Sequence, residues 1–589
     1  MFKLDRQVSF LAALALIISA TADFAIAHGP APAIAEVEEL TLNTPCNDQW
    51  CGGTIVVAGE KLIIPRNLLI DLPANRLTLR QLFDQAPAAC KTLGQSGLAR
   101  ADTCLNGAKG AQATINANRS NCGGVIIGDL FIQKGPEAIT GSVTFINYAE
   151  GYLRINGTPG QNTKGTLVRV NDPTSKHTIQ RGLGCAGTTN NCSPDPRFTN
   201  DPDNYTVSFN TGYPLCIPST VVSATHPTPS NAVGVGDPAC PDTNRTVAPV
   251  PDSTRFAPIK LGDVVTAEGG IEVVNDVRFL SAHTLTINTG LTTRALPTQP
   301  DYVLVGEAEF DTANFPRRRA RARFLGNTTL PDSQLDIFTL RVDPRDNESH
   351  EDILSSTVGN PRTFNRAIAG PGGIWRIFLD VDFLQGIPVR PEGSPCTHLA
   401  NAGLAICSDT PTLAEEFSRL SPVPREIIVR SRHKERLNTG VVTRDINNQT
   451  SQNGEYLMPL GVGLGGFELP VPDEFDLGFG VVPFVFEGFP WMLDRRLSPG
   501  GCVGNCENTP QPLEPFPVSG IDPRGLENDV PASAADRTIT YFLGADLQPR
   551  LIASFPPVDR CPGPALSNTL IQHRQSRYLS ERWVPKVKR

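Results

Sequence analysis

The fold of this chain is decided by two stretches, ITGSVTFINYAEGYLRIN (residues 139–156) and RFAPIKLGDVVTAEGGIEVVNDVRFLSAHTLTIN (residues 255–288). Apolar and polar residues alternate in both, as they do in strands, where successive side chains point to opposite faces of the sheet. In the first stretch Tyr152, Arg154 and Asn156 share one face, opposite Leu153 and Ile155. Turn residues at 147–151 and 275–276 close a hairpin in each stretch. With the neighbouring residues 124–138 and 157–173, the pattern predicts five or more short strands of a small, highly curved barrel.

The second stretch contains Leu261-Gly262-Asp263-Val264, and the strands follow as a hairpin, a strand, a connection and a closing strand pair. This order resembles the OB-type barrels found in many secreted bacterial proteins. The resemblance implies an OB-like barrel over residues 124–290 with a long, disulfide-stapled insertion at 174–254. OB-type barrels often bind oligonucleotides or sugars, although a fold does not by itself fix a function. Alternation with glycine turns also fits a β-sandwich, and that alternative stays open.

The chain as a whole reads as mainly β. Its 589 residues have room for several domains, helix patterns are scarce, and 52 glycines and 52 prolines punctuate short apolar runs. Alternation within residues 301–435 predicts a β-sandwich, for which an immunoglobulin-like arrangement is one candidate. The predicted organisation is a signal peptide at 1–27, a stapled β/loop region at 28–123, the OB-like barrel at 124–290, the sandwich at 301–435, a Gly/Pro/Phe-rich strap at 436–499, and an irregular Pro-rich tail, disordered in part, at 500–589.

The N-terminus and the cysteines both indicate export. Residues 1–27 carry basic residues, then a short apolar segment, then Ala25-Ile26-Ala27, the order of a secretory signal. No later segment predicts a membrane span. An even number of cysteines, 14, is typical of disulfide-bonded exported proteins. We therefore expect a secreted or cell-surface protein, or a periplasmic one in a Gram-negative host. Near neighbours predict the pairs Cys46–Cys51, Cys185–Cys192, Cys216–Cys240, Cys396–Cys407 and Cys502–Cys506; Cys90, Cys104, Cys122 and Cys561 allow three connectivities, of which we favour Cys90–Cys104.

Charge and motifs narrow the function. The net charge of −8 argues against a nucleic-acid partner. The sequence contains no Gly-x-Ser-x-Gly, no His-Glu-x-x-His and no glycine-rich phosphate loop. This pattern favours a non-enzymatic binding protein over an enzyme.

Two kinds of metal site are candidates, and no other cofactor is expected. Dense Asp/Asn turns supply the oxygens that calcium prefers, although such residues also form turns without any metal. If cleavage follows Ala27, His28 becomes the N-terminal residue and offers its amine and ring to copper, with His177, His226 or His283 as a second ligand. The candidate calcium residues are Asp195, Asp201 and Asp203 with Asn204 in one loop, and Asp343, Asp346 and Glu348 in another.

Two charged strands have competing interpretations. In Arg317–Arg323 every second residue is an arginine, so this strand presents either a docking face for an acidic polysaccharide or lipid headgroup, or a solvated sheet face. Asp380 and Asp382 project from one strand face, as the paired carboxylates of a glycosidase do, or protect a sheet edge.

Several short motifs in order, among them Cys-Asn-Asp-x-Trp-Cys-Gly-Gly-Thr-Ile (46–55), Ile-Pro-Arg-Asn-Leu-Leu (64–69) and Arg-Val-Asn-Asp-Pro (169–173), resemble a group of large, uncharacterised secreted β-proteins of filamentous fungi and some bacteria. The resemblance covers about residues 45–480 and implies export and β architecture, without catalytic residues to carry over. We expect a non-enzymatic protein of the cell surface or matrix that binds a glycan or a surface protein through residues 174–254. The alternative is a secreted enzyme acting on polysaccharide through carboxylates or a metal at His28.

Overall fold

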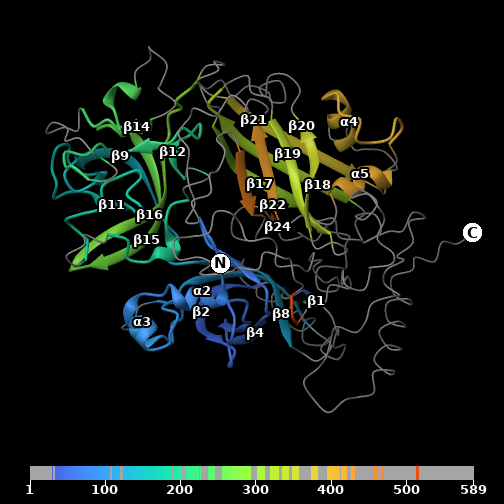
Figure 1. Ribbon diagram of the computed structural model, residues 1–589, viewed down its shortest axis with the longest axis horizontal. Helices are drawn as coiled ribbons and strands as arrows, with labels where there is room; N and C mark the ends of the chain where they lie inside the picture. Colours follow the sequence, from blue (N-terminus) through green and yellow to red (C-terminus); the bar gives the residue numbers. More distant parts are fainter. Residues whose placement is uncertain are drawn as a thin grey trace, which may run out of the picture.

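The structure is a computed structural model. It describes residues 29–30, 33–105, 109–119, 124–186, 192–201, 204, 206–223, 226, 236–245, 255–293, 302–311, 319–330, 335–343, 348–356, 373–382, 394–411, 413–420, 426–431, 455–459, 467–468 and 513–515. Figure 1 shows that these residues form three bodies, a first barrel, a second barrel and a sandwich of two sheets. The fold is therefore mainly β, as the sequence predicts.

The first barrel is closed by five strands. Its core consists of inward-facing aliphatic residues such as Ile55, Leu62, Ile115 and Ile127. The strand order is β2-β3-β4-β8-β7 and back to β2; β4 and β8 run parallel, and the other neighbours run antiparallel. The strands are β2 (Ala33–Leu42), β3 (Gly53–Val57), β4 (Glu60–Ile64), β7 (Gln112–Arg119) and β8 (Val125–Gln133), with β1 (Gly29–Pro30) paired to β7.

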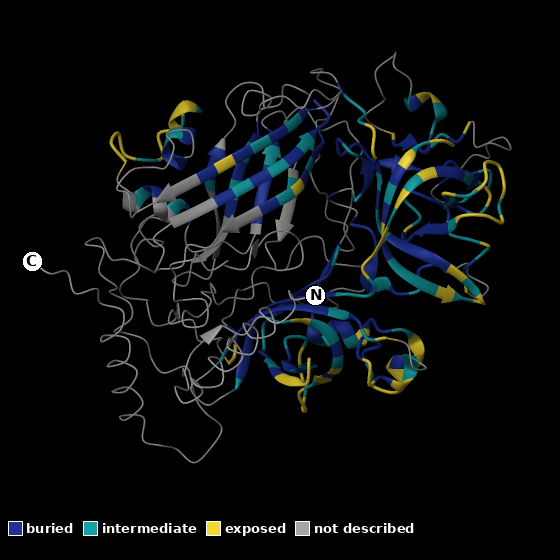
Figure 2. Cartoon of the chain, turned by 180° about the vertical axis from the view of Figure 1, so that it is seen from behind, coloured by how far each residue is buried: buried dark blue, intermediate teal, exposed yellow. Residues whose placement is uncertain are grey.

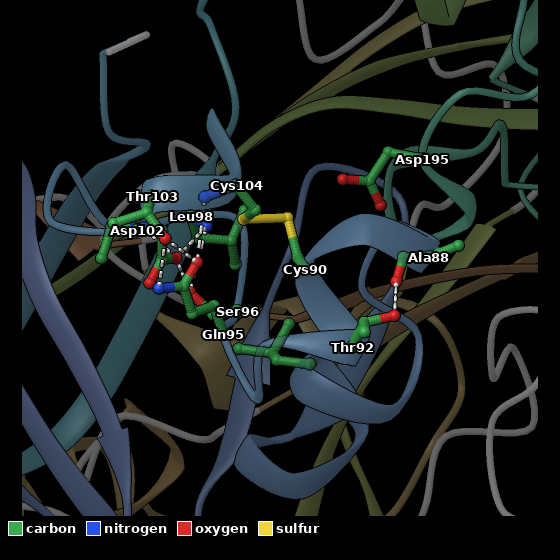
Figure 3. Close-up of a disulfide and its surroundings, with 12 residues drawn as sticks. Ala88, Cys90, Thr92, Gln95, Ser96, Leu98, Asp102, Thr103, Cys104 and Asp195 are labelled. Atoms are coloured by element: carbon green, nitrogen blue, oxygen red, sulfur yellow. Dashed lines mark hydrogen bonds between the residues drawn. A yellow bond between two sulfur atoms is a disulfide. The ribbon is translucent and has the colours of Figure 1, made fainter. Parts of the chain in front are cut away.

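A short helical region separates β4 from β7. The helix α2 (Leu79–Asp84) begins at a capping box, in which Thr78 accepts a hydrogen bond from the Gln81 amide and the Gln81 side chain accepts one from the Thr78 amide. Figure 3 shows the next segment, where Cys90 and Cys104 form a disulfide and the Asp102 carboxylate accepts hydrogen bonds from Ser96 and Leu98. The same region contains β5 (Leu69–Asp71), β6 (Arg76–Thr78), α3 (Ala88–Thr92) and the 3₁₀ turn Thr103–Leu105.

One predicted boundary in this part of the chain is wrong. We expected residues 28–123 to form a stapled β/loop region, and they supply four strands of a closed barrel. We expected the central barrel to begin at residue 124, whereas β8 pairs with β4 and β7 of the first barrel. Strand alternation shows which face of a strand is apolar but does not identify its neighbours, so the error lies in pairing rather than in the strand itself.

The second barrel is the one that the sequence predicts, without β8. Its strand order is β9-β10-β11-β16-β15 and back to β9, with β11 and β16 parallel and the other neighbours antiparallel. Hairpins form at both predicted turns, and Asn275 and Asp276 both have positive φ. The strands are β9 (Glu137–Asn147), β10 (Tyr152–Ile155), β11 (Thr166–Val170), β15 (Val264–Val274) and β16 (Val277–Ile287).

The sandwich packs two four-stranded sheets around one core that includes Phe324, Trp375 and Val429. It extends past the predicted end at residue 435, because β23 (Glu455–Pro459) pairs with β22 and β24 (Phe467–Glu468) pairs with β17. The remaining strap prediction lies outside the described residues. The sheets contain β17 (Val303–Asp311), β18 (Arg319–Thr328), β21 (Gly373–Asp382) and β24, and β19 (Leu335–Asp343), β20 (Glu348–Ser356), β22 (Glu426–Ser431) and β23; helices α4 (Pro395–Asn401) and α5 (Leu413–Leu420) flank them.

The insertion at 174–254 joins the three bodies. Arg197 donates to the carbonyl oxygens of Leu82 and Ser96 in the first barrel at 2.8 and 2.7 Å. On the opposite side, Asn327 of the sandwich donates to the carbonyl of Asn210 at 2.7 Å. The described elements of the insertion are the 3₁₀ turns Pro196–Phe198 and Asp242–Arg245 and the strands β12 (Val207–Phe209) and β13 (Leu215–Cys216), of which β12 pairs with β16 and β13 with β14 (Ala257–Pro258).

Disulfides close loops in all three bodies. The pairs Cys46–Cys51, Cys185–Cys192, Cys216–Cys240 and Cys396–Cys407 are confirmed, and so is Cys90–Cys104. Cys502 and Cys506 lie outside the described residues, as do the predicted signal peptide and most of the predicted tail. Within that tail, Leu513 is buried in the core of the first barrel and Glu514 pairs with Arg66. Several disulfides are consistent with folding in an oxidising, extracellular compartment.

Candidate functional site

The candidate site is the outer face of the second barrel. Strand register places Phe145 of β9 opposite Arg154 of β10, Arg154 opposite Leu167 of β11, and Leu167 beside Phe279 of β16. Directly paired residues lie on the same face of a sheet, about 5 Å apart at their Cβ atoms. Four strands therefore present one transverse row of side chains, which we call the outer row (Phe145, Arg154, Leu167, Phe279).

A second row lies beside the outer row. Tyr152, two residues before Arg154, contacts Arg169, whose guanidinium carbon lies 5.2 Å from the centre of the Tyr152 ring. Tyr152, Leu167 and Phe279 form a small apolar cluster outside the main barrel core, with Phe145 packed against its edge. The barrel thus has apolar clusters on both sides of its wall.

One half of this face is covered by residues 181–185 of the insertion, which we call the cover segment. Arg169 donates to the carbonyl oxygens of Arg181 and Leu183, both at 2.6 Å. The amide of Leu183 donates to the Glu150 carboxylate at 2.8 Å. The Asn275 side chain donates to the carbonyl of Cys185 at 2.7 Å. The cover segment is therefore fixed to both hairpin turns of the barrel as well as to β11.

The conformation of the cover segment depends on Gly184. This residue has φ +78°, which L side chains rarely adopt, and an added Cβ would lie 3.0 Å from the Phe279 ring. Close backbone approach leaves Phe279 and Arg169 each 1% exposed. Burial lowers the pKa of Arg169 to about 10, so the guanidinium remains charged at neutral pH.

The other half of the face is accessible. Phe145, Arg154 and Asn162 are partly exposed (Figure 2 maps burial along the chain). The Asn162 carbonyl oxygen accepts a hydrogen bond from Arg154 Nε at 3.0 Å, and its amide nitrogen donates to the Tyr152 hydroxyl at 2.8 Å. Arg154 Nη1 donates to the Gly165 carbonyl at 3.1 Å. An aromatic ring and a fixed guanidinium thus stand side by side at the surface.

Part of this site can be predicted from the sequence. Tyr152 and Arg154 lie on the face opposite Leu153 and Ile155, as the alternation predicts, and Leu153 and Ile155 are fully buried in the barrel. Phe145 and Phe279 could be assigned to strands, but their register with Arg154 depends on pairings between residues far apart in the chain. Asn162 lies in a connection without any periodic signal.

The structure gives Asp195 a role other than calcium binding. Both of its carboxylate oxygens accept hydrogen bonds from Arg197, at 2.8 and 2.7 Å, and Lys134 Nζ lies 3.7 Å away. Burial alone would raise the pKa of Asp195, but the charges of Arg197 and Lys134 outweigh this effect and lower it. Two cationic side chains leave no uncompensated negative charge for a metal ion.

The remaining calcium candidates are only partly described. Asp201 is buried and accepts a hydrogen bond from the Asn204 amide at 3.1 Å, an arrangement common in turns. Asp203 lies outside the described residues. Asp343 and Glu348 are partners across the β19–β20 hairpin, and Asp346 at its tip lies outside the description. Within the described ranges, the one cluster of potential metal ligands is Cys396, Cys407 and Glu415, and its two cysteines are joined in a disulfide.

The histidines named as copper ligands serve structural contacts in the described part of the chain. His177 is buried, stacks on Phe256 at 4.8 Å and bonds the Leu215 carbonyl through Nδ1. His226 pairs with Asp237 at 2.6 Å. His283 contacts the Thr284 hydroxyl. His28 itself lies outside the described residues.

Strand register explains the charged strands of the sandwich. Arg319 and Arg321 of β18 pair with Asp382 and Asp380 of β21, and Arg323 forms an ion pair with Glu307 of β17. The backbone register thus sets positions 319 and 321 of β18 opposite acidic positions of β21, and Arg323 has an acidic partner on β17. Arg317 lies outside the described residues.

Several described residues of the insertion are buried, unlike the exposed residues expected of a ligand-binding loop. Arg197, Phe209, Tyr213 and Asp237 are each 1% exposed or less. Its described residues hold the bodies together and form the cover segment.

No helix within the described ranges has the length and apolar character needed to cross a bilayer. Comparison with known proteins finds no matching family model, no matching curated protein and no matching solved structure.

Proposed function

We propose that the protein is a secreted, non-enzymatic component of the cell surface or matrix that binds a glycan through the accessible half of the outer row. Phe145 offers an aromatic face on which a sugar ring can stack. The partly exposed Arg154 and Asn162 offer donors and acceptors beside it. Small-molecule sites commonly combine apolar surface with a few fixed polar groups of this kind.

The barrel topology supports this proposal. In both barrels the third and fifth strands pair in parallel and the fifth is followed around the barrel by the fourth and the first. We propose that both are OB-type barrels, which are five-stranded Greek-key barrels that bind oligosaccharides or oligonucleotides on the face of their second and third strands. Those strands are β10 and β11 in the second barrel. The net charge of −8 favours a saccharide over a nucleic acid.

The sandwich is proposed to be immunoglobulin-related. Its first, second and fifth strands share one sheet with the eighth, and its third, sixth and seventh strands share the other with the fourth. Immunoglobulin-type sandwiches divide the first, second and fifth strands from the third, sixth and seventh in the same way, although the constant type keeps its fourth strand in the first sheet. Such a domain supports a surface or matrix role as a spacer or attachment module.

The single observation that carries the proposal is the pairing of partly exposed Phe145 with Arg154, which is fixed by Asn162 and Gly165. The test is a glycan array with the full chain and with Phe145→Ala. The matched control is Thr266→Ala, a partly exposed position on β15 outside the outer row. We expect binding that Phe145→Ala reduces at least tenfold and Thr266→Ala preserves. Equal binding by all three proteins would show that the ligand does not bind at the outer row.

A further inference from the structure

We infer that the ligand is an acidic glycan and that Arg154 binds the carboxylate of a uronic acid residue. This inference rests on the proposed function and names the ligand class of the same site. It is carried by how the Arg154 guanidinium is held.

Arg154 differs in its partners from the eight described arginines that form ion pairs with a carboxylate within 4.0 Å. Arg154 has no carboxylate partner among the described residues, and its two hydrogen-bond acceptors are a side-chain amide and a backbone carbonyl. Neutral acceptors fix the orientation of a guanidinium without cancelling its charge. The positive charge of Arg154 is therefore available to a ligand.

The guanidinium is also oriented before any ligand binds. Nε and Nη1 are occupied by Asn162 and Gly165, and Asn162 is in turn held by the Tyr152 hydroxyl. These contacts leave Nη2 and the outer edge of the guanidinium for a ligand. Arginine binds carboxylates through two parallel hydrogen bonds, and a side chain that is already fixed loses less conformational entropy on binding.

The surroundings match an acidic sugar. Lys164, exposed in the β10–β11 connection, directly precedes Gly165, whose carbonyl accepts a hydrogen bond from Arg154, and adds a second positive charge to this connection. Phe145 lies directly across from Arg154, so a pyranose ring can stack on it while its carboxylate reaches the guanidinium. The acidic residues at the covered end already have partners: Glu150 accepts a hydrogen bond from the Leu183 amide, and Glu272, directly across from Phe279, forms an ion pair with Lys134 at 2.8 Å. The accessible half is thus locally basic in a chain whose net charge is negative.

The experiment measures the dissociation constants of oligogalacturonides and of the same oligosaccharides after reduction of their carboxyl groups to alcohols. Both are titrated by calorimetry in the presence of a calcium chelator, into the full chain and into Arg154→Gln, Arg154→Lys and Phe145→Ala. The control variant is Arg278→Gln, which removes an exposed arginine of β16. Circular dichroism and thermal unfolding establish that each variant is folded.

We expect the wild-type chain to bind the acidic form at least tenfold more tightly than the reduced form, with affinity falling as salt rises. Arg154→Gln should abolish that preference, Arg154→Lys should restore part of it, and Arg278→Gln should leave it unchanged. Equal affinity for both forms that still depends on Phe145 would overturn the acidic inference and keep the glycan-binding proposal. Absence of binding to both forms and to a glycan array would overturn both.

Discussion

At the scale of single residues, the most consequential contact is the one between Arg197 and Asp195. Arg197 is fully buried and donates five hydrogen bonds, to Asp195 and to two backbone carbonyls of the first barrel. Replacing one partner of a buried pair leaves an uncompensated charge, which costs far more than the pair contributes. The contact therefore determines whether the first barrel and the insertion stay joined.

We predict that Arg197→Met lowers the free energy of unfolding by about 3–5 kcal/mol, because Asp195 remains buried without its main partner. Chemical denaturation followed by fluorescence measures this. The control is Arg100→Met, which removes an exposed ion pair with Glu36 and should change stability by about 1 kcal/mol or less. The double variant Asp195→Asn/Arg197→Met should recover part of the loss, and a cost for Arg197→Met as small as that of Arg100→Met would contradict this role.

One buried histidine, His177, and one half-buried histidine, His283, make stability depend on pH. Burial lowers the pKa of His283 to about 4, and it also lowers the pKa of His177. Between pH 6.5 and about 4 the unfolded chain binds protons that the folded chain does not, so stability falls as pH falls through this range. For His283 the loss is at most about 3 kcal/mol.

The measurement is the free energy of unfolding of the wild-type chain and of His283→Gln from pH 7 to pH 4. The variant should lose less stability than the wild type over this interval. Asp195 and Asp237, whose pKa values are lowered despite burial, contribute stability that is lost only at lower pH, below about 3.8. Identical pH profiles for wild type and variant would exclude His283 as a titrating group of this range.

At this scale, the sequence predicts which residue types are present but not which residues they contact. Asp195 was named for its oxygens, and the structure uses them for Arg197, two residues later in the chain. Arg154 was placed on the correct face by alternation, whereas its contacts with Asn162 and Gly165 depend on the path of the β10–β11 connection. Partners of this kind depend on tertiary packing, which a local pattern does not contain.

At the scale of elements, the cover segment decides how much of the second barrel a ligand can reach. It is anchored by Arg169, Glu150 and Asn275, and the disulfide Cys185–Cys192 begins at its last residue. The outer row therefore has an accessible end at Phe145 and a covered end at Phe279.

We predict that the double substitution Cys185→Ser/Cys192→Ser loosens the cover segment, since a disulfide that closes a short loop contributes about 2–3 kcal/mol. Amide hydrogen exchange should quicken at residues 181–185 and stay slow in β15. The control is Cys46→Ser/Cys51→Ser, which opens a loop in the first barrel and should leave exchange at 181–185 unchanged. Unchanged exchange in the first variant would show that the hydrogen bonds of Arg169, Glu150 and Asn275 hold the segment without the disulfide.

The strands and hairpins also show which structural features can be predicted from the sequence. Hairpins at 147–151 and 275–276, the strands around them and the sandwich strand Leu335–Asp343 were predictable, because each is local. Closure of β8 into the first barrel was not, because it depends on a parallel pair between residues more than 60 positions apart, Leu62 and Val125. Alternation is the same whichever barrel a strand joins.

At the scale of the whole molecule, the insertion acts as a joint. Phe198 is buried in the core of the first barrel, while Tyr213 packs against Tyr302 at the start of the sandwich with ring centres 5.1 Å apart. The long insertion was expected to be the ligand loop; its described residues instead connect the three bodies. A length of chain without periodicity does not reveal whether it faces solvent or another domain.

We predict that the two barrels unfold in one calorimetric transition and that Phe198→Ser separates them into two. Loss of a buried aromatic residue from the first core costs about 3–5 kcal/mol and weakens the joint. The matched control is Phe378→Ser, an exposed aromatic position of the sandwich that should leave the transition intact. Two transitions already present in the wild type would show that the insertion does not couple the unfolding of the two barrels.

The central claim is that ligand binds on the outer row of the second barrel, and hydrogen exchange of the full chain with and without bound glycan tests it most directly. We predict that a glycan selected on an array slows exchange in residues 143–167, which include Phe145, Arg154 and Asn162, and leaves the first barrel and the sandwich unchanged. Protection confined to the first barrel or to the sandwich would contradict the claim and move the site to that body.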